Sequence, residues 1–180
     1  MNKKYGQPKQ NNYKSILFWG IIALITLVFI IAIIVKFAQS RTVDSYDSLT
    51  QLEGEELFEA SEGKYIVFVY NSEKEEATSS DEFDQVVFNY ITFAKRNSGE
   101  ENVLAIFGFD VTKPENNKVV ISDNGGKIEK VINVEEIKDL LIKEGNVPAL
   151  LVIKDNKITD YKDSDNAISD YLQSIIDENK

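Results

Sequence analysis

The chain has 180 residues, a formal net charge of −10, and neither cysteine nor histidine. These absences exclude thiol chemistry, disulfides, imidazole acid–base catalysis and nearly every kind of zinc site, so only carboxylates remain to hold a hard cation. The charge is uneven, since residues 1–43 contain six Lys and Arg and no acid, whereas residues 44–180 contain 14 Lys and Arg against 30 Asp and Glu. So acidic a surface repels phosphates, and we expect no nucleic-acid partner.

An apolar segment from Ile16 to Val35 is the first element of the chain. Its twenty residues carry no charge and lie between Lys14 and Lys36. About 20 residues at 1.5 Å each cross a hydrocarbon core of about 30 Å, so we predict a transmembrane helix over residues 15–37 that makes the membrane a partner. The alternative, a cleaved signal peptide, has a shorter apolar region and a small-x-small cleavage site. Lys36-Phe37-Ala38 puts a cation where a small residue is needed, which favours an uncleaved anchor.

The flanking charges predict the orientation of this helix. Four lysines precede it, and beyond Arg41 the chain turns acidic. Cytoplasmic flanks are enriched in Lys and Arg, so we expect a single-pass plasma-membrane protein with a cytoplasmic N-terminus. Residues 1–14, rich in Asn, Gln and Lys, are predicted to be a disordered cytoplasmic tail. Residues 38–47 are then a linker, and residues 48–180 an extracellular domain.

The first half of the domain predicts alternating helices and strands. In chain order these are a helix over 55–61, a strand over 65–70, a long helix from Ser79 or Ser80 to about residue 97, and a strand over 103–109 followed by Asp110. The strand over 65–70 is apolar on both faces, as expected for a covered central strand. Ser79 and Glu82 have the spacing of a capping box, which places the start of the long helix.

The second half is less regular. Residues 111–133 predict an extra β-hairpin, because Val119-Val120-Ile121 and Ile128 to Ile132 flank Asn124-Gly125-Gly126. Asn133 and Glu136 form another capping pair, which predicts a helix that ends at Gly145. The buried side of this helix would carry Ile137, Leu140 and Leu141.

The stretch from Gly145 to Ile158 predicts a β-hairpin that begins with a proline. Pro148 has no N–H and therefore suits the first position of a strand rather than its middle. Asp155-Asn156 tolerates the positive φ angles of a tight turn, and the second strand runs to Tyr161. A final amphipathic helix is predicted from about Asp165.

This order of elements, with Val-Pro-Ala-Leu-Leu from Val147 to Leu151, resembles the thioredoxin fold over roughly residues 48–178. The predicted fold class is therefore α/β, with a thioredoxin-like central sheet flanked by helices and preceded by one N-terminal transmembrane helix. The resemblance implies that Pro148 is cis. It also implies that the proline loop faces the start of the long helix, where members of this family bind extended peptide.

The chain departs from the family at the reactive residues. The resemblance places Ala77-Thr78-Ser79-Ser80 where the two cysteines would sit, Phe68 near the position of the buried acid, and Ile106 near that of its lysine partner. Thiol–disulfide exchange needs a thiolate, so oxidoreductase activity is excluded. The layout also resembles membrane-anchored thioredoxin-like accessory proteins of low-GC Gram-positive bacteria, some described as bacteriocin-transport accessory proteins.

From these features we predict a non-enzymatic protein-binding or accessory module without cofactor or metal. An extended segment of a protein partner would lie in a groove between two sets of residues. These are Thr78, Ser79 and Ser80 on one side, and Val147, Pro148 and Ala149 on the other. In the simpler interpretation, Ser79 only caps a helix and Pro148 only shapes a turn.

Two other functions remain open. One is a structural subunit of a larger membrane or secretion complex, recruited through its transmembrane helix. The other is a cation binder or a hydrolase that uses paired carboxylates such as Glu75-Glu76, although neighbouring acids in a polar loop are usually solvated.

Overall fold

The computed structural model describes residues 13–39, 43–60, 63–74 and 81–179. The chain divides into two compact units, residues 1–40 and 41–180. The predicted tail, most of which falls in residues 1–12, lies outside the described residues, and so do parts of the predicted linker. The limits of tail, linker and domain therefore stay predictions.

The first unit contains one helix, α1 (Tyr13–Gln39). Its segment Ser15–Val35 has a mean hydropathy of 3.0 over its most apolar window, and every one of its side chains is exposed. The helix is thus long and apolar enough to cross a membrane, as predicted. That it does cross one stays a prediction.

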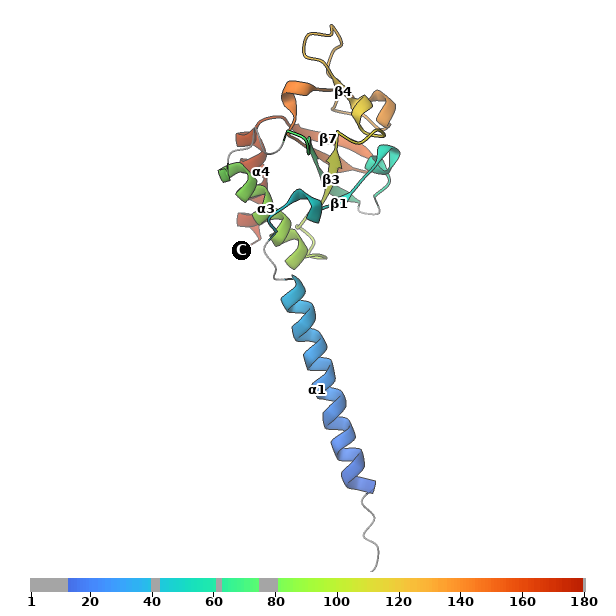
Figure 1. Ribbon diagram of the computed structural model, residues 1–180, viewed down its shortest axis with the longest axis vertical. Coiled ribbons are helices and arrows are strands. Elements are labelled where there is room, and N and C mark those ends of the chain that lie inside the picture. Colours follow the sequence, from blue (N-terminus) through green and yellow to red (C-terminus); the bar gives the residue numbers. More distant parts are fainter. Residues whose placement is uncertain (1–12, 40–42, 61–62, 75–80, 180) are drawn as a thin grey trace, which may run out of the picture. The chain divides into compact units, whose positions relative to one another are not determined.

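The second unit is built on a mixed five-stranded sheet in the order β1-β3-β2-β6-β7 (Figure 1). The strands are β1 (Thr50–Gln51), β2 (Lys64–Tyr70), β3 (Ala105–Asp110), β6 (Ala149–Lys154) and β7 (Lys157–Lys162). β3 is parallel to both β1 and β2, whereas β6 is antiparallel to both β2 and β7. This order, with these directions, is that of the thioredoxin-like α/β fold predicted from the sequence.

β2 divides the core into two layers because its residues alternate between the faces of the sheet. Ile66, Phe68 and Tyr70 pack with α3 (Asp81–Arg96) and α4 (Asp165–Glu178). Figure 1 shows these two helices on the same side of the sheet. The residues between them on β2 face a second core formed mainly by short 3-10 helices and loops. The strand is therefore buried on both faces, as its apolar sequence predicts.

The predicted helix between Asn133 and Gly145 is wrong. Its place is taken by a 3-10 helix (Ile137–Asp139), strand β5 (Ile142–Lys143) and a second 3-10 helix (Glu144–Asn146). The backbone of this segment is already bonded to strands: Ile158 of β7 accepts from Asn133 N–H (2.9 Å) and donates to the Val134 carbonyl (3.0 Å). Every third residue from Val131 to Leu140 is buried, and this spacing resembles that of an amphipathic helix.

The predicted hairpin within residues 111–133 is also wrong. Strand β4 (Val120–Ile121) pairs in parallel with β5, and Lys130 pairs with Leu141. The partners of this segment thus lie further along the chain, beyond the predicted hairpin. The predicted helix over 55–61 appears as a 3-10 helix (Gly54–Phe58), and residue 61 lies outside the described residues. The hairpin turn is confirmed, with φ angles of 52° at Asp155 and 60° at Asn156.

Asn116 joins the outer part of the sheet to the loop after β3. Its fully buried amide donates to the carbonyls of Leu52 (3.2 Å) and Asp110 (3.0 Å), and its oxygen accepts from Gly54 N–H (2.8 Å). A buried polar group that loses its partner destabilises the fold because the group has been desolvated. Asn116 is therefore a structural residue.

Replacing Asn116 with alanine should lower the free energy of unfolding by about 3 kcal/mol, because two buried backbone groups and one partly buried one lose their partner. Urea unfolding of the full chain in detergent, followed by circular dichroism, measures the change. Asn117→Ala is the matched control, since Asn117 is exposed, and should change stability by less than about 0.5 kcal/mol. Equal stability of the two variants would contradict the structural role.

Candidate functional site: the groove at Val147 and Pro148

The Val147–Pro148 peptide bond is cis, as the resemblance implied. Both residues are partly exposed and line a cavity of about 370 Å³, which we call the proline groove. Ala149, also predicted to bind a partner, starts β6 opposite Val69 and is 0 % exposed, so its side chain cannot contact a partner. Thr78, Ser79 and Ser80 lie outside the described residues, as do Glu75 and Glu76.

Aromatic side chains form the inner wall of the proline groove. They come from three elements: Tyr46 from the segment before β1, Phe68 and Tyr70 from β2, and Phe83 from the first turn of α3. The Tyr46 ring lies 4.9 Å from that of Phe68 and 5.2 Å from that of Tyr70. The Tyr46 hydroxyl also donates to Asp84 of α3 at 2.6 Å, so Tyr46 contacts β2 through its ring and α3 through its hydroxyl. The inner part of the groove is therefore apolar and rigid.

The rim of the groove is polar. Lys74 Nζ and Glu144 Oε1 form an ion pair at 2.5 Å, and about half of each side chain is exposed. Asn71 accepts from the Glu73 and Lys74 N–H groups and so fixes the turn that carries Lys74. An exposed ion pair adds little stability, about 0–1 kcal/mol, so it can open at small cost when another charged group approaches. The groove thus combines an apolar interior with a polar mouth.

The backbone on the proline side of the groove is braced by a distant loop. Gly145 N–H donates to Asp123 Oδ1 at 3.1 Å. A Cβ on residue 145 would lie 3.0 Å from the other oxygen of Asp123, so a larger residue here would require the exposed Asp123 side chain to shift. Val147 N–H donates to the Glu144 carbonyl at 3.3 Å, so this backbone donor already has a partner within the same wall of the groove.

Asp110 organises the loops near the C-terminal ends of β2 and β3. Its carboxylate is buried and accepts from Ser72 Oγ (2.8 Å), Thr112 Oγ1 (2.9 Å) and Thr112 N–H (3.0 Å). Burial alone raises the pKa of this carboxyl, but the hydrogen bonds from Thr112 and Ser72 outweigh it and hold the pKa below the ordinary 3.8. Asp110 is thus an ionised structural anchor, fully occupied by its donors.

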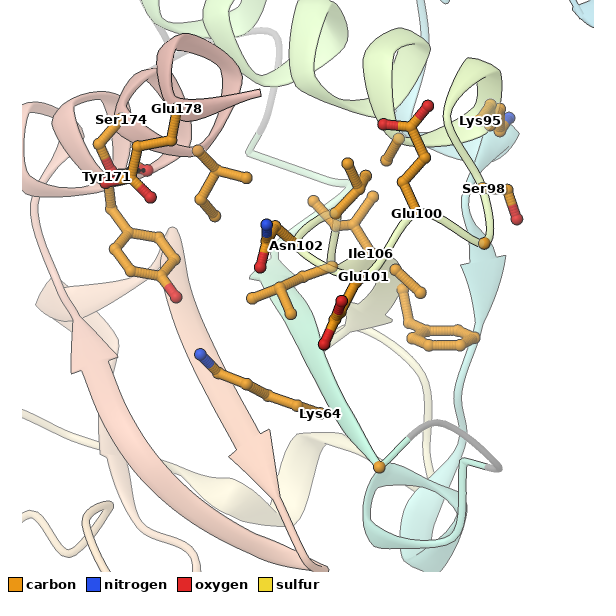
Figure 2. Close-up of a pocket in the computed structure, with 18 of the residues that line it drawn as sticks. Lys64, Lys95, Ser98, Glu100, Glu101, Asn102, Ile106, Tyr171, Ser174 and Glu178 are labelled. Carbon is orange, nitrogen blue, oxygen red and sulfur yellow. Dashed lines mark hydrogen bonds between the residues drawn. The ribbon is translucent and has the colours of Figure 1, made fainter. Parts of the chain in front are cut away.

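A second, larger cavity of about 1010 Å³ lies near the opposite end of β2. Figure 2 shows Lys64 of β2 extending into it towards Tyr171 of α4, with Glu100 and Glu101 on the loop after α3. Lys64, Glu100 and Glu101 are exposed, and the cavity mixes charges of both signs with half-buried apolar residues such as Ile106. Solvated side chains of this kind do not define a ligand.

No residue in either cavity supplies thiol chemistry, because the sequence contains no cysteine. Phe68, which the resemblance places near the family's buried acid, is fully buried in the aromatic wall. Within the described residues no group of three or more Asp or Glu side chains is placed to hold a metal ion. The chain therefore has a thioredoxin-like fold that cannot exchange thiols and disulfides.

Two solved structures are distantly similar to this chain. Oxidised mitochondrial thioredoxin 3 from Saccharomyces cerevisiae aligns with a TM-score of 0.40 and 12 % identity, over 73 % of this chain and 99 % of that one. A point mutant of a thioredoxin from Halobacterium salinarum aligns with a TM-score of 0.38 and 12 % identity, over 74 % of this chain and 95 % of that one. No protein-family model and no curated protein matches the chain.

Several groove residues were not predicted from the sequence. Tyr46 falls in the predicted linker and Glu144 in the predicted helix, so neither was assigned to the groove. One signal was available for Tyr46: Ser45 precedes it and accepts from Asp47 N–H, a local turn typical of Ser. Nothing in the local pattern indicates that Glu144 meets Lys74, because that contact depends on the long-range pairing of β4 with β5.

Asp110→Asn should make the free energy of unfolding depend less on pH in the acidic range. The folded-state pKa of Asp110 lies below its unfolded value, so its contribution is complete above about pH 4 and is lost as the pH falls through the folded pKa. We expect Asp110→Asn to lose about 1–3 kcal/mol at pH 7, and the difference from wild type to shrink towards pH 3. Urea titrations of the full chain in detergent between pH 3 and 7 test this, with the exposed Asp170→Asn as control. A difference that stays constant with pH would contradict this role.

Proposed function

We propose that this chain is a membrane-anchored, non-redox member of the thioredoxin-like class that binds an extended segment of another protein in the proline groove. The observation that supports the proposal is the groove itself, an aromatic cavity of about 370 Å³ bordered by Val147 and Pro148 in a chain without cysteine. Peptide binding of this kind uses backbone pairing and side-chain pockets, neither of which needs a thiol. We further propose that the chain is not an enzyme and acts as an accessory or chaperone-like module.

The chemistry of the groove suggests what it holds. Its volume suits one large apolar side chain, which would pack against the partly exposed Val147 and Pro148, while Lys74 and Glu144 are positioned to contact polar groups at the mouth. Burying such a side chain contributes about 1.5–3 kcal/mol. Residues 44–180 contain 30 acids against 14 Lys and Arg, so segments with positive charge approach fastest. A basic, extended segment with one large apolar residue therefore fits best.

The cellular arrangement is part of the same proposal. The lysines before α1, together with the acidic chain beyond it, favour a cytoplasmic N-terminus and a domain on the outer side of the plasma membrane. In that position the partner would be another protein of the cell envelope. A single pass through the membrane keeps the domain near its site of action.

A photoreactive amino acid at position 147 in the full chain should crosslink a protein partner in native membranes, because Val147 lines the groove and is partly exposed. The same probe at Glu178, which lines the second cavity, is the control and should not capture that protein. Capture from position 178 alone would contradict the proposal.

A blocking variant makes this test specific. Phe83→Ala would enlarge the apolar interior and remove packing, whereas Val147→Glu places a charge at the wall of the groove. Added wild-type full chain should compete for the captured partner, and added full chain carrying Val147→Glu should not, because the charge would be buried without a partner. Near-UV circular dichroism checks that Val147→Glu is folded. Undiminished competition by the folded Val147→Glu chain would place the partner elsewhere.

A second candidate is a structural subunit recruited through α1. One observation favours it: Gly20 of α1 has open space around it and lies among Ile16, Leu17, Ile21 and Leu24, where a second helix could approach closely. Small residues permit such approach between membrane helices. The proline groove would then be incidental.

Exchanging Ile16 to Val35 for an unrelated apolar helix of the same length separates the two candidates. If the groove carries function, the exchanged chain should still give the crosslink from position 147. Loss of association after the exchange, reproduced by Gly20→Ile alone, would favour recruitment through α1. Membrane fractionation confirms that both variants remain inserted.

A further inference from the structure

The loop Ser122–Lys130 is fixed to the proline groove. Asp123 accepts from Gly145 N–H at 3.1 Å, and Lys130 and Leu141 exchange two backbone hydrogen bonds at 2.9 Å. The loop is also anchored at its start, where β4 pairs in parallel with β5. Residues distant in sequence thus form one rigid unit with the backbone that leads to Pro148.

Glu129 is the central contact of this unit. Its carboxylate accepts from Lys143 N–H (2.9 Å), from Asn146 Nδ2 through both oxygens (3.0 Å each) and from the Tyr161 hydroxyl (3.1 Å). Burial, followed by the charge of Glu129, raises the pKa of Tyr161, so the phenol stays protonated and remains a donor. Hydrogen bonds to a charged acceptor are roughly twice as strong as neutral ones. Glu129 therefore holds Asn146, the residue directly before Val147.

Ile128, next to Glu129, points into solvent. Among the large apolar side chains that the structure describes it is the most exposed, at 85 %, ahead of Ile16 on α1 at 69 %. A solvent-exposed isoleucine is common, but this one is held on a loop whose base is bonded on both sides. A mobile loop would lose conformational entropy on binding, whereas a braced one loses little.

The same partner can reach both places. The path from Ile128 through Glu129 and Asn146 to Val147 crosses two peptide units, two side chains and one hydrogen bond, at most about 20 Å. An extended chain covers this in about six residues at roughly 3.3 Å each. One linear segment is therefore long enough to contact Ile128 and enter the proline groove.

We propose that Ile128 is a second contact for the protein segment that occupies the proline groove, and that Glu129 is the positioning residue that keeps the two contacts at a fixed spacing. This inference rests on the proposed function, because it assigns an additional surface to the same partner. The segment would carry two apolar residues no more than about six positions apart. Burying part of one isoleucine side chain changes affinity by about tenfold.

The test places the photoreactive amino acid at position 128 and, separately, at position 147 of the full chain in native membranes. Both probes should capture the same protein, identified by mass spectrometry, and added wild-type full chain without a probe should compete for both. Ile128→Ser should lower capture from position 147 about tenfold at limiting partner. Ile132→Ser is the matched control, since Ile132 lies near the same loop, is 45 % exposed, and should have little effect.

Glu129 is tested separately because its effect acts through other residues. Glu129→Ala should abolish capture from position 128 while weak capture from position 147 remains, and should speed amide hydrogen exchange at Lys143 and Asn146 but not in β2. Glu129→Gln keeps one acceptor oxygen and should restore part of both effects. General destabilisation would instead accelerate exchange in β2 and reduce capture equally from both positions, which would overturn the positioning role.

The outcomes separate this inference from the proposed function. The inference is overturned, and the groove proposal stands, if position 147 captures a protein but position 128 does not capture the same one. Position 128 would then capture nothing, or lipid, a second copy of this chain or a different protein. Failure of capture at position 147 overturns the proposed function and the inference with it. Capture of one protein from both positions, weakened by Ile128→Ser, supports both.

Discussion

The burial of β2 on both faces is the constraint on which the rest of the domain depends. Six consecutive residues, Tyr65 to Tyr70, are at most 4 % exposed, so both faces of this strand must be covered and both of its edges paired. β3 and β6 occupy the edges, and α3 and α4 cover one face. The other face is covered by 3-10 helices and loops, which come mainly from the segment between β3 and β6. Val147 of the proline loop packs against the same cluster, so this segment and the proline loop lie close together.

The sequence predicted the elements whose pattern is local. The apolar run of β2, the amphipathic spacing of α3 and α4, and the turn at Asp155 and Asn156 each follow from neighbouring residues. The helix predicted between Asn133 and Gly145 is wrong because the spacing of three from Val131 to Leu140 resembles that of an α-helix, whereas the structure has turns followed by a short 3-10 helix (Ile137–Asp139). The conformation of this segment is decided by the hydrogen bonds of Asn133 and Val134 to Ile158 of β7, which local periodicity does not report.

The candidate site was predicted in part, for the same reason. Val147 and Pro148 were found because a proline at a strand start is a local signal. Ala149 proved to be core, since alternation along β6 turns its side chain into the sheet's second layer. The rest of the groove is assembled from separate elements, and its ion pair and aromatic wall exist only through tertiary contacts. The proline groove thus combines an apolar wall with a charged mouth.

Tyr46 links the groove to the part of the chain that follows α1. The tyrosine belongs to residues that precede the sheet, yet its ring forms part of the groove wall and its hydroxyl is bonded to α3. Val43, three residues before Tyr46, donates its N–H to the Thr92 hydroxyl of α3. A protease cut before Val43 would leave the wall of the proline groove complete, whereas a cut after Tyr46 would remove one of its rings. The position of such a cut would then decide whether the remaining domain could still bind the partner that we propose.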